Sequence, residues 1–329
     1  MNLYTSVDLP DNLPRITQNN HLLLMGSCFS VNMGQLLVDA KFPCDINPFG
    51  VLYNPLSIST ALREIAGDKI YSREDLFFYR ECWHSSMHHS DFSSPDMEET
   101  LQHINARLAG AREEMPRLDC ILLTFGTAWV YEDNKTSKVV GNCHKRPESA
   151  FTRRRLSVEE IVTDYSQLFS HLLEANAQLK FMITVSPIRH ARDGMHENQL
   201  SKATLLLAAE RLQTDFPGHV FYFPAYELLM DELRDYRFYA EDLVHPSSVA
   251  IQYVWEKFAY CCFTKEALLI MDECENIRKS LEHKPFHPES EGYKRFLEQI
   301  VLKMEQLNQK YPYLDFQKER DLCHIRLQK

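Results

Sequence analysis

The feature that most constrains the fold is a set of four short apolar segments, at residues 21–25, 120–125, 181–185 and 219–223. None of them shows the alternation of apolar and polar residues that marks a strand with one exposed face. A strand that is apolar on both faces is typical of a parallel sheet with helices packed on both sides. The segments therefore predict an α/β fold with a parallel sheet.

Segments with helical periodicity separate these apolar runs. Ser94 stands before Pro95, and Ser157 lies three residues before Glu160, which is the spacing of a capping box. Alternating strands and helices predict a doubly wound α/β domain. The helices are expected over residues 30–40, 55–66, 95–115, 158–179, 197–216 and 247–260.

Two segments interrupt this alternation, and we expect both to be insertions beside a functional site. Residues 77–94 hold several aromatic and histidine side chains without a clean period. Residues 130–142 predict a hairpin that turns at Asp133, Asn134 and Lys135.

The composition changes after residue 263, so we predict two domains: a main domain over residues 1–262 and a helical C-terminal extension over residues 263–329. The extension is expected to hold helices at 265–282 and 291–310, followed by a charged tail. Leu297, Ile300, Val301 and Met304 recur at helical spacing in the second helix. This apolar face predicts packing either on the main domain or on a partner, and the second alternative would make a homo-oligomer.

Charge and composition exclude several classes of partner. The net charge of -10 and the lack of a long basic stretch argue against nucleic acid. No apolar run reaches membrane-spanning length, so no membrane partner is expected. Residues 1–12 do not resemble a secretory signal, because they lack a positively charged start followed by an apolar stretch. Nine unevenly spaced cysteines without a C-x-x-C pair are typical of reduced thiols, so we expect a cytoplasmic location.

The junction between the first apolar segment and the next helix carries Gly26, Ser27 and Cys28. Where a buried strand turns abruptly into a helix, a serine hydroxyl is exposed and backbone N–H groups point at developing negative charge. Such a hydroxyl is a poor nucleophile unless a base accepts its proton. Far downstream, His245 is our candidate for this base, with Asp242 holding its imidazole in the productive tautomer. Ser27, Asp242 and His245 thus predict a Ser-His-Asp hydrolase.

The thiol of Cys28 is the alternative nucleophile, because thiols are intrinsically better nucleophiles than hydroxyls. Neighbouring side chains at a turn point in different directions, so one of Ser27 and Cys28 is expected to face His245. We expect Ser27 to be the nucleophile and Cys28 to pack inward as a small apolar group.

The string from Gly26 to Phe29 resembles the signature of the GSCFA family, which is similar to the SGNH or GDSL-like hydrolases. The Asp-x-x-His motif near the end of those domains matches Asp242 to His245. The other blocks that resemble the family are residues 47–50, 124–129, 142–144, 185–190 and 193–203, so the resemblance covers about residues 20–260. It implies a three-layer α/β/α, flavodoxin-like SGNH fold with Ser27, Asp242 and His245 as the catalytic triad.

The sequence departs from the SGNH pattern in the oxyanion hole, the set of donors that stabilises the developing negative charge. SGNH enzymes generally complete it with a glycine and an asparagine from two further blocks. Gly50 fits the glycine, but residues 126–129 offer no asparagine. Losing one donor costs about 10² to 10³ in rate. We therefore expect the Thr127 hydroxyl to replace the asparagine beside the Ser27 and Gly50 N–H groups, with Asn142 as a further candidate. A slow enzyme and a different reaction are the alternatives.

The histidine-rich segment offers a competing chemistry. His84, His88, His89 and Asp91 are close enough in sequence to form a metal site, but their spacing matches no strong metal signature. The alternatives are that this set, with His89 as its candidate site residue, lines a substrate pocket, and that it is an ordinary aromatic loop. No metal or other cofactor is expected.

Arg189 follows the third apolar segment, at the end of the sheet where open α/β domains bind ligands. An arginine there can hold a carboxylate or a sugar hydroxyl, and a salt bridge to Asp193 or Glu197 is the alternative. His144 and His190 are expected to border the same pocket.

The expected activity is that of a serine hydrolase that cleaves or transfers an acyl ester through an acyl-enzyme. A small-molecule or carbohydrate ester is the expected substrate, because the resemblance extends to superfamily members that remove acetyl groups from sugars. Trp83, Trp129 and Tyr131 would then stack on a sugar ring. The alternatives are a catalytically slow or inactive binding module whose helical extension mediates assembly, and a metal-dependent hydrolase.

Overall fold

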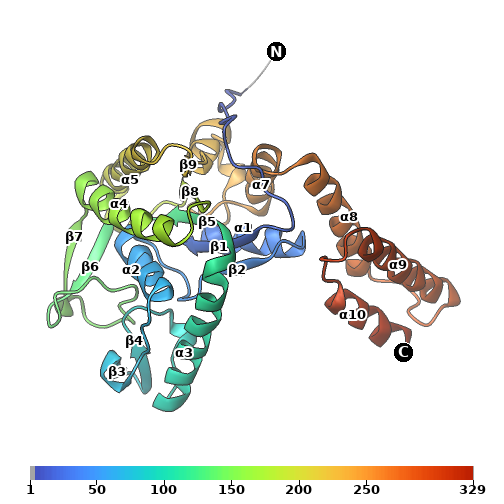
Figure 1. Ribbon diagram of the computed structural model, residues 1–329, viewed down its shortest axis with the longest axis horizontal. Coiled ribbons are helices and arrows are strands. Elements are labelled where there is room, and N and C mark those ends of the chain that lie inside the picture. The colour runs from blue at the N-terminus through green and yellow to red at the C-terminus, as the bar shows by residue number, and fades with distance from the viewer. Residues whose placement is uncertain (1–3, 329) are drawn as a thin grey trace.

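The computed structural model describes residues 4–328, and its centre is a five-stranded parallel sheet (Figure 1). The strands are β1 (His21–Gly26), β2 (Cys44–Ile46), β5 (Leu118–Phe125), β8 (Lys180–Val185) and β9 (Val220–Tyr222). Their spatial order is β2-β1-β5-β8-β9, which is the flavodoxin-like order, and this confirms the predicted parallel sheet. The sequence pattern does not predict β2, because three residues at a sheet edge leave no distinct apolar run.

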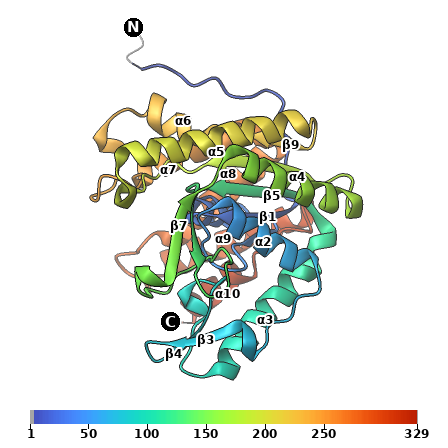
Figure 2. The same ribbon diagram turned by 90° about the vertical axis from the view of Figure 1, so that its left-hand side faces the viewer.

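Helices cover both faces of the sheet and make three layers (Figure 1 and Figure 2). On one face lie α1 (Cys28–Asp39) and α7 (Ser248–Cys262). On the other lie α2 (Pro55–Ala66), α3 (Met97–Glu114), α4 (Val158–Ala175) and α5 (Met195–Asp215), and the short α6 (Ala225–Glu227) follows β9. The predicted three-layer α/β/α fold is confirmed. No helix within residues 4–328 has the length and the apolar character needed to cross a membrane.

Each strand contributes to both hydrophobic layers, because successive side chains point to opposite faces of a sheet. In β1, Leu22 and Leu24 are buried against the α1 and α7 side, whereas Leu23 and Met25 are buried against the α2 to α5 side. Both faces of the strand are therefore apolar, which explains why its sequence shows no alternation.

The helix boundaries follow the capping residues. The predicted capping box of Ser157 and Glu160 is present at the start of α4. Ser27 itself caps α1, so this helix begins at Cys28 and not at residue 30. The cap of α3 is Asp96, whose carboxylate accepts two backbone N–H groups, and not Ser94.

Both insertions contain antiparallel strand pairs. In the first, β3 (Leu76–Tyr79) pairs with β4 (Cys82–Ser85), a hairpin that the sequence pattern does not predict. In the second insertion, the strand partner that the predicted hairpin requires is wrong. The chain turns after Asp133, but the returning segment makes an isolated bridge at Val139. The strand partner of β6 (Trp129–Asp133) is instead β7 (Phe151–Arg155).

The C-terminal segment forms α8 (Lys265–Glu282), α9 (Glu291–Lys310) and α10 (Gln317–Leu327), which project to one side of the sheet (Figure 1). The predicted charged tail forms the helix α10, which the sequence pattern does not predict, and Phe316 and Cys323 anchor it to the other two helices. Leu297, Ile300 and Met304 of α9 are buried in the same cluster. The extension thus covers the apolar face of α9 itself. The domain boundary at residue 262 and a homo-oligomer through these helices stay predictions.

Gly26 is required by the close approach of β1 to β5. Its φ is +143°, and a Cβ atom at this position would lie 2.2 Å from the carbonyl oxygen of Thr124. We expect Gly26→Ala to lower the free energy of unfolding by about 2–4 kcal/mol, because the two strands must move apart.

The matched control is Gly110→Ala in α3, where, apart from the neighbouring residues and the backbone of the helix itself, no described atom lies within 4 Å of the Cβ position. This change should stabilise the protein by up to about 1 kcal/mol, because alanine favours a helix. Urea denaturation measures both variants, and a similar stability for the two would contradict the close approach at Gly26.

Candidate active site

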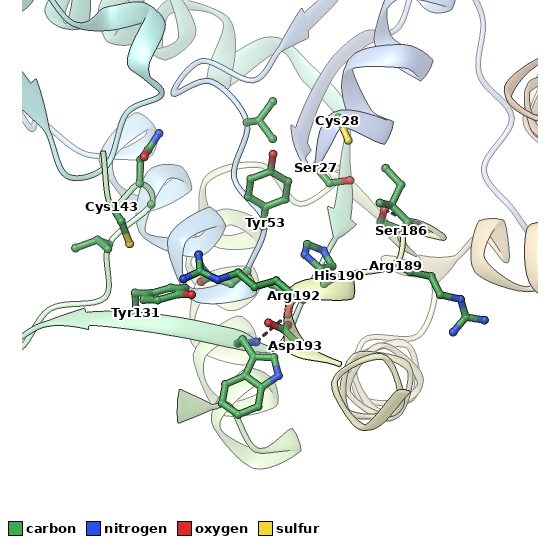
Figure 3. Close-up of a pocket in the computed structure, with 18 of the residues that line it drawn as sticks. Ser27, Cys28, Tyr53, Tyr131, Cys143, Ser186, Arg189, His190, Arg192 and Asp193 are labelled. Atoms are coloured by element: carbon green, nitrogen blue, oxygen red, sulfur yellow. Dashed lines mark hydrogen bonds between the residues drawn. The ribbon is translucent and has the colours of Figure 1, made fainter. Parts of the chain in front are cut away.

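A cavity of about 500 Å³ opens at the carboxyl end of the sheet (Figure 3). Ser27 follows β1, Thr127 follows β5 and Ser186 follows β8, and all three residues line this cavity. In a flavodoxin-like sheet the strand order reverses between the first and third strands, here β1 and β5, and ligands bind in the crevice at that point. The cavity lies where this topology is expected to bind a ligand.

Ser27 is placed by the tight junction between β1 and α1. Its backbone is extended, with φ -69° and ψ 177°, and α1 begins at the next residue. The hydroxyl oxygen accepts a hydrogen bond from the Phe29 N–H at 3.3 Å, as an N-cap does. Ser27 is 1% exposed but lines the cavity. The predicted nucleophile is therefore held rigidly at the floor of the cavity.

The loop before α7 holds the predicted base and carboxylate as one hydrogen-bonded pair. His245 Nδ1 lies 2.5 Å from one oxygen of Asp242, and the other oxygen accepts the N–H groups of Val244 and His245. These hydrogen bonds lower the pKa of Asp242 to about 2, and the bond from the His245 N–H has the largest effect. The carboxylate is therefore ionised near neutral pH. In the neutral tautomer that donates from Nδ1 to this carboxylate, Nε2 is left as the acceptor of the imidazole.

Ser27 and His245 line the same cavity, so the fold brings together residues from opposite ends of the predicted main domain. Within residues 4–328 the Ser27 hydroxyl donates no hydrogen bond, to His245 or to another group. Catalytic hydrogen bonds are often long in enzymes without substrate. The His245 side chain is 49% exposed, which leaves it room to approach Ser27.

Cys28 does not pack inward as expected but lines the cavity beside Ser27 (Figure 3). The reason is that α1 starts at Cys28, so both residues lie at the end of the helix that meets the cavity. Burial raises the pKa of the thiol despite the nearby Lys202. The thiol is therefore protonated near neutral pH, which disfavours Cys28 as the nucleophile.

The predicted oxyanion donors already have hydrogen-bond partners. The Ser27 N–H donates to a carbonyl of β5 at 3.3 Å, and the Gly50 N–H donates to the Asn47 carbonyl at 2.7 Å. The Thr127 hydroxyl pairs with the Ser201 hydroxyl at 3.1 Å. Thr127 lines the cavity, whereas Gly50 lies outside it. An oxyanion role for any of the three requires an exchange of partner, and it stays a prediction.

The other predicted pocket residues divide into two groups. His89, Asn142 and Arg189 line the cavity. His144 lies outside it, buried, with Nε2 2.8 Å from the carbonyl oxygen of Ser85. Burial lowers the pKa of His144 to about 4, so this imidazole is neutral near pH 7.

The residues proposed for a metal site are used in other contacts. His84 bonds the Ser93 hydroxyl at 2.7 Å, and His88 bonds the Ser85 hydroxyl at 2.9 Å. Within residues 4–328, no three His, Cys, Asp or Glu side chains are arranged to hold a metal ion. His89 lines the cavity and pairs with Asp91 at 3.0 Å, which fits the substrate-pocket alternative.

One wall of the cavity is aromatic. Trp129 and Tyr131 of β6 line it, and the Arg153 guanidinium of β7 lies 4.3 Å and 5.4 Å from their ring centres. Asp193 pairs with Arg153 and fixes it there. Trp83, the third predicted stacking residue, lies outside the cavity on β4.

The floor of the cavity is supported by one polar face of α5, formed by Asn198, Ser201 and Lys202, each at most 2% exposed. Lys202 Nζ donates to the carbonyl oxygens of Gly126 at 2.6 Å and Ser186 at 2.5 Å. These carbonyls follow β5 and β8, so one side chain ties together the ends of two neighbouring strands. We call this contact the Lys202 clamp.

His190 borders the cavity below Ser27, as expected (Figure 3). Its N–H donates to the Asn198 side chain at 3.0 Å, so α5 positions it as well. Burial, and then the charges of Lys202 and His245, lower the pKa of His190 to about 4. A neutral imidazole beside Ser27 can donate a hydrogen bond to a substrate oxygen or accept one from a hydroxyl.

Two family models match the sequence. Residues 21–258 match the GSCFA family, and residues 274–329 match the C-terminal domain of GSCFA domain proteins. The chain belongs to the GSCFA family. The first match spans the whole cavity, from Ser27 to His245.

Two solved structures similar to this GSCFA-family chain are carbohydrate esterases. One is a carbohydrate esterase family 2 enzyme plus carbohydrate-binding domain from Corynascus thermopiles (Myceliophthora fergusii). It is 12% identical, with a TM-score of 0.39, over 79% of this chain and 68% of that chain. The other is a carbohydrate esterase family 3 from Talaromyces cellulolyticus, 12% identical, with a TM-score of 0.34, over 77% of this chain and 99% of that chain. None of the curated proteins compared with the sequence matches it.

The α5 residues that support the site of this GSCFA-family protein have a signal in the sequence. They lie in residues 193–203, one of the blocks that resemble the family. A spacing of three and four residues places Asn198, Ser201 and Lys202 on the same helix face as the buried Leu205. Polar residues in line with an apolar stripe indicate buried polar contacts, but the sequence does not show which backbone groups they meet.

Lys202→Met tests the Lys202 clamp, because it leaves two buried carbonyl oxygens without their donor. We expect the free energy of unfolding, measured in urea at about pH 9.5, to fall by about 2–4 kcal/mol. Lys265→Met at the exposed start of α8 is the control and should change it by less than about 0.5 kcal/mol. A loss no larger than that of the control would contradict the Lys202 clamp.

The loss caused by Lys202→Met should also depend on pH, because burial lowers the pKa of Lys202 from 10.5 to about 7. Between these two values the unfolded chain binds a proton that the folded chain does not, so the contribution of Lys202 to stability rises with pH. Below this window both states are protonated, and the folded state bears the cost of a buried charge. The loss should therefore be smaller at about pH 6 than at about pH 9.5, and equal losses would mean that the pKa is not lowered.

Proposed function

We propose that this protein is a serine hydrolase that cleaves or transfers an acyl ester, with Ser27 as nucleophile, His245 as general base and Asp242 as the residue that orients the base. One observation carries the proposal: Ser27 lines the same cavity as His245, whose imidazole is already bonded to Asp242 at 2.5 Å. Residues so far apart in the sequence share this cavity because β1 and the loop before α7 end at the same edge of the sheet.

In the proposed reaction the Ser27 oxygen attacks the carbonyl carbon of the ester while its proton passes to Nε2 of His245. The ionised Asp242 stabilises the imidazolium that forms. The tetrahedral intermediate then expels the alcohol, which takes the proton from His245, and an acyl-enzyme remains. Water, or a second alcohol in a transfer reaction, attacks the acyl group with His245 again as the base.

The developing oxyanion needs N–H donors close to Ser27. Cys28 is the first residue of α1, so its N–H has no acceptor within the helix. Within residues 4–328 this N–H donates to no other group. We propose it as the principal donor, assisted by the positive end of the α1 dipole. Thr127 and Asn142, which line the cavity, are the proposed additional donors.

A carbohydrate O-acyl ester is the proposed substrate class. Trp129 and Tyr131 offer aromatic surface on the cavity wall, which suits the apolar face of a sugar ring. Arg153 covers one face of each ring, so a sugar would stack on the opposite face or displace the guanidinium. The volume of about 500 Å³ is in the range of small-molecule sites.

We assign this activity to the domain predicted over residues 1–262, because every residue that lines the cavity lies between Ser27 and His245. Residues 263–329 are then a helical extension outside the site. A cytoplasmic location remains a prediction from the sequence.

Labelling with a fluorophosphonate probe tests the nucleophile. The folded protein should form a covalent adduct on Ser27, located by peptide mass spectrometry. Ser27→Ala should lose the adduct, and Cys28→Ala should keep it, because the hydroxyl is the proposed nucleophile. An adduct on Cys28 would make the protein a thiol hydrolase. No adduct on Ser27 in the folded protein would favour the alternative of an inactive binding module.

Removing members of the triad should show that they act as one unit. Ser27→Ala and His245→Ala should each lower the turnover of a 4-nitrophenyl ester by about 10³-fold or more, with little change in melting temperature. The double variant should be no worse than either single variant, and a much larger loss would argue against the triad. If a chelator abolishes turnover while Ser27→Ala leaves it intact, the protein is a metal-dependent hydrolase.

A further inference from the structure

Three arginines line the cavity, and they differ in how their charge is balanced. Arg153 is ion-paired with Asp193, and Arg192 is ion-paired with Glu148. Arg189 forms no ion pair within the described part of the chain, residues 4–328. One arginine of the cavity therefore carries a charge that no residue from 4 to 328 neutralises.

The salt bridge considered for Arg189 from the sequence is not present. Its two candidate partners, Asp193 and Glu197, pair instead with neighbouring arginines of β7. The Arg189 guanidinium contacts the sulfur of Met230 at 3.1 Å, which offers weak acceptor capacity and no charge. Tyr239 also lies beside the guanidinium. Both contacts are with neutral groups, so within residues 4–328 the charge of Arg189 stays available for an anion.

Arg189 also lies at the junction of two cavities. A second cavity of about 560 Å³ adjoins the first, and Arg189 lines both. Leu243, in the loop that carries His245, lines the second cavity too. Figure 3 shows the Arg189 side chain pointing away from Arg192 and Tyr131, on the far side of Ser27. A ligand that extends from Ser27 away from the aromatic wall would pass the Arg189 guanidinium.

The second cavity contains other charged residues, but they are close to opposite charges. Arg234 lies 4.0 Å from Asp231, and Asp235 lies 3.9 Å from Arg237. His196 lines the cavity as well. Arg189 is therefore the charge at this junction that lacks an opposite charge within residues 4–328.

We infer that Arg189 binds an anionic oxygen group of the substrate, a carboxylate or a phosphate, on the part of the ester that extends from Ser27 toward the second cavity. A guanidinium presents two parallel N–H donors that match the oxygens of either group. This inference rests on the proposed function, because it names the substrate class of the same site. A carbohydrate ester that also carries a carboxylate or a phosphate satisfies both proposals.

Matched 4-nitrophenyl esters test the inference: the pentanoate, and the glutarate half-ester, which has a carboxylate where the pentanoate has a methyl group. The wild type should favour the glutarate in kcat/KM by about tenfold to hundredfold, mainly through KM. Arg189→Gln should lower this ratio toward one, and Arg189→Lys should keep part of it. Arg192→Gln should leave the ratio unchanged, because Arg192 is already paired with Glu148. An ester that ends in a phosphate identifies which anion is preferred.

Binding to Ser27→Ala separates this inference from the proposed activity. Calorimetric titration with monobenzyl glutarate and with benzyl pentanoate should show about tenfold tighter binding of the anion. Adding Arg189→Gln should remove the preference, and adding Arg192→Gln should not. Equal affinities, or a preference that survives Arg189→Gln in a variant with an unchanged melting temperature, would overturn the inference. Absence of a Ser27 adduct with a neutral fluorophosphonate would overturn the proposed function instead, and the titration would still decide the role of Arg189.

Discussion

The Lys202 clamp is the interaction on which the rest of the candidate site depends. Backbone carbonyls beyond the end of a sheet have no ladder partner, and buried carbonyls require a donor. Lys202 supplies one donor to Gly126 and one to Ser186 from a position that is 1% exposed. Burial disfavours the charged form of Lys202 and so lowers its pKa. The neighbouring residues Thr127 and His190 take their positions from the same polar face of α5.

The site combines a rigid half and an exposed half. Ser27 is held between the sheet and α1 and is almost fully buried, whereas Asp242 and His245 lie on a loop with about half of each side chain exposed. No hydrogen bond joins the two halves within residues 4–328, so the proposed reaction needs His245 to come within hydrogen-bond reach of Ser27 when a substrate is bound. Leu243 of the loop also borders the second cavity, so a substrate reaching that cavity would contact the loop directly.

The charges around the cavity are unevenly balanced. Arg153 and Arg192 are neutralised by carboxylates, and Asp242 is bonded to His245. Arg189 is left without an opposite charge in the described chain, and the N-terminus of α1 points at the same region. This arrangement would favour negative charge at two places, at the oxyanion of the proposed reaction beside Ser27 and at the substrate group proposed to bind Arg189.

Strong local patterns and family blocks predicted most of the sheet and the candidate triad. The apolar runs revealed β1, β5, β8 and β9 because these strands are buried on both faces. Local signals failed where a partner distant in sequence decides the structure. The strand β6 pairs with β7 rather than with the segment just after its turn. The helix α10 is stabilised because Phe316 and Cys323 pack against α8 and α9. The edge strand β2 was too short to leave a pattern.

The sequence by itself determined the α/β class, the serine at the end of the first strand, and the Asp242 to His245 motif. Apolar strands and short motifs can be recognised from residues that are close together in the sequence. The tertiary structure alone decided that Ser27 and His245 share a cavity, that Cys28 faces it, and that Lys202 ties two strands together. It also decided that Arg189 lacks the carboxylates expected beside it, since Asp193 and Glu197 pair with other arginines. These contacts join residues that are distant in the chain, so they form only when the layers of the fold pack together.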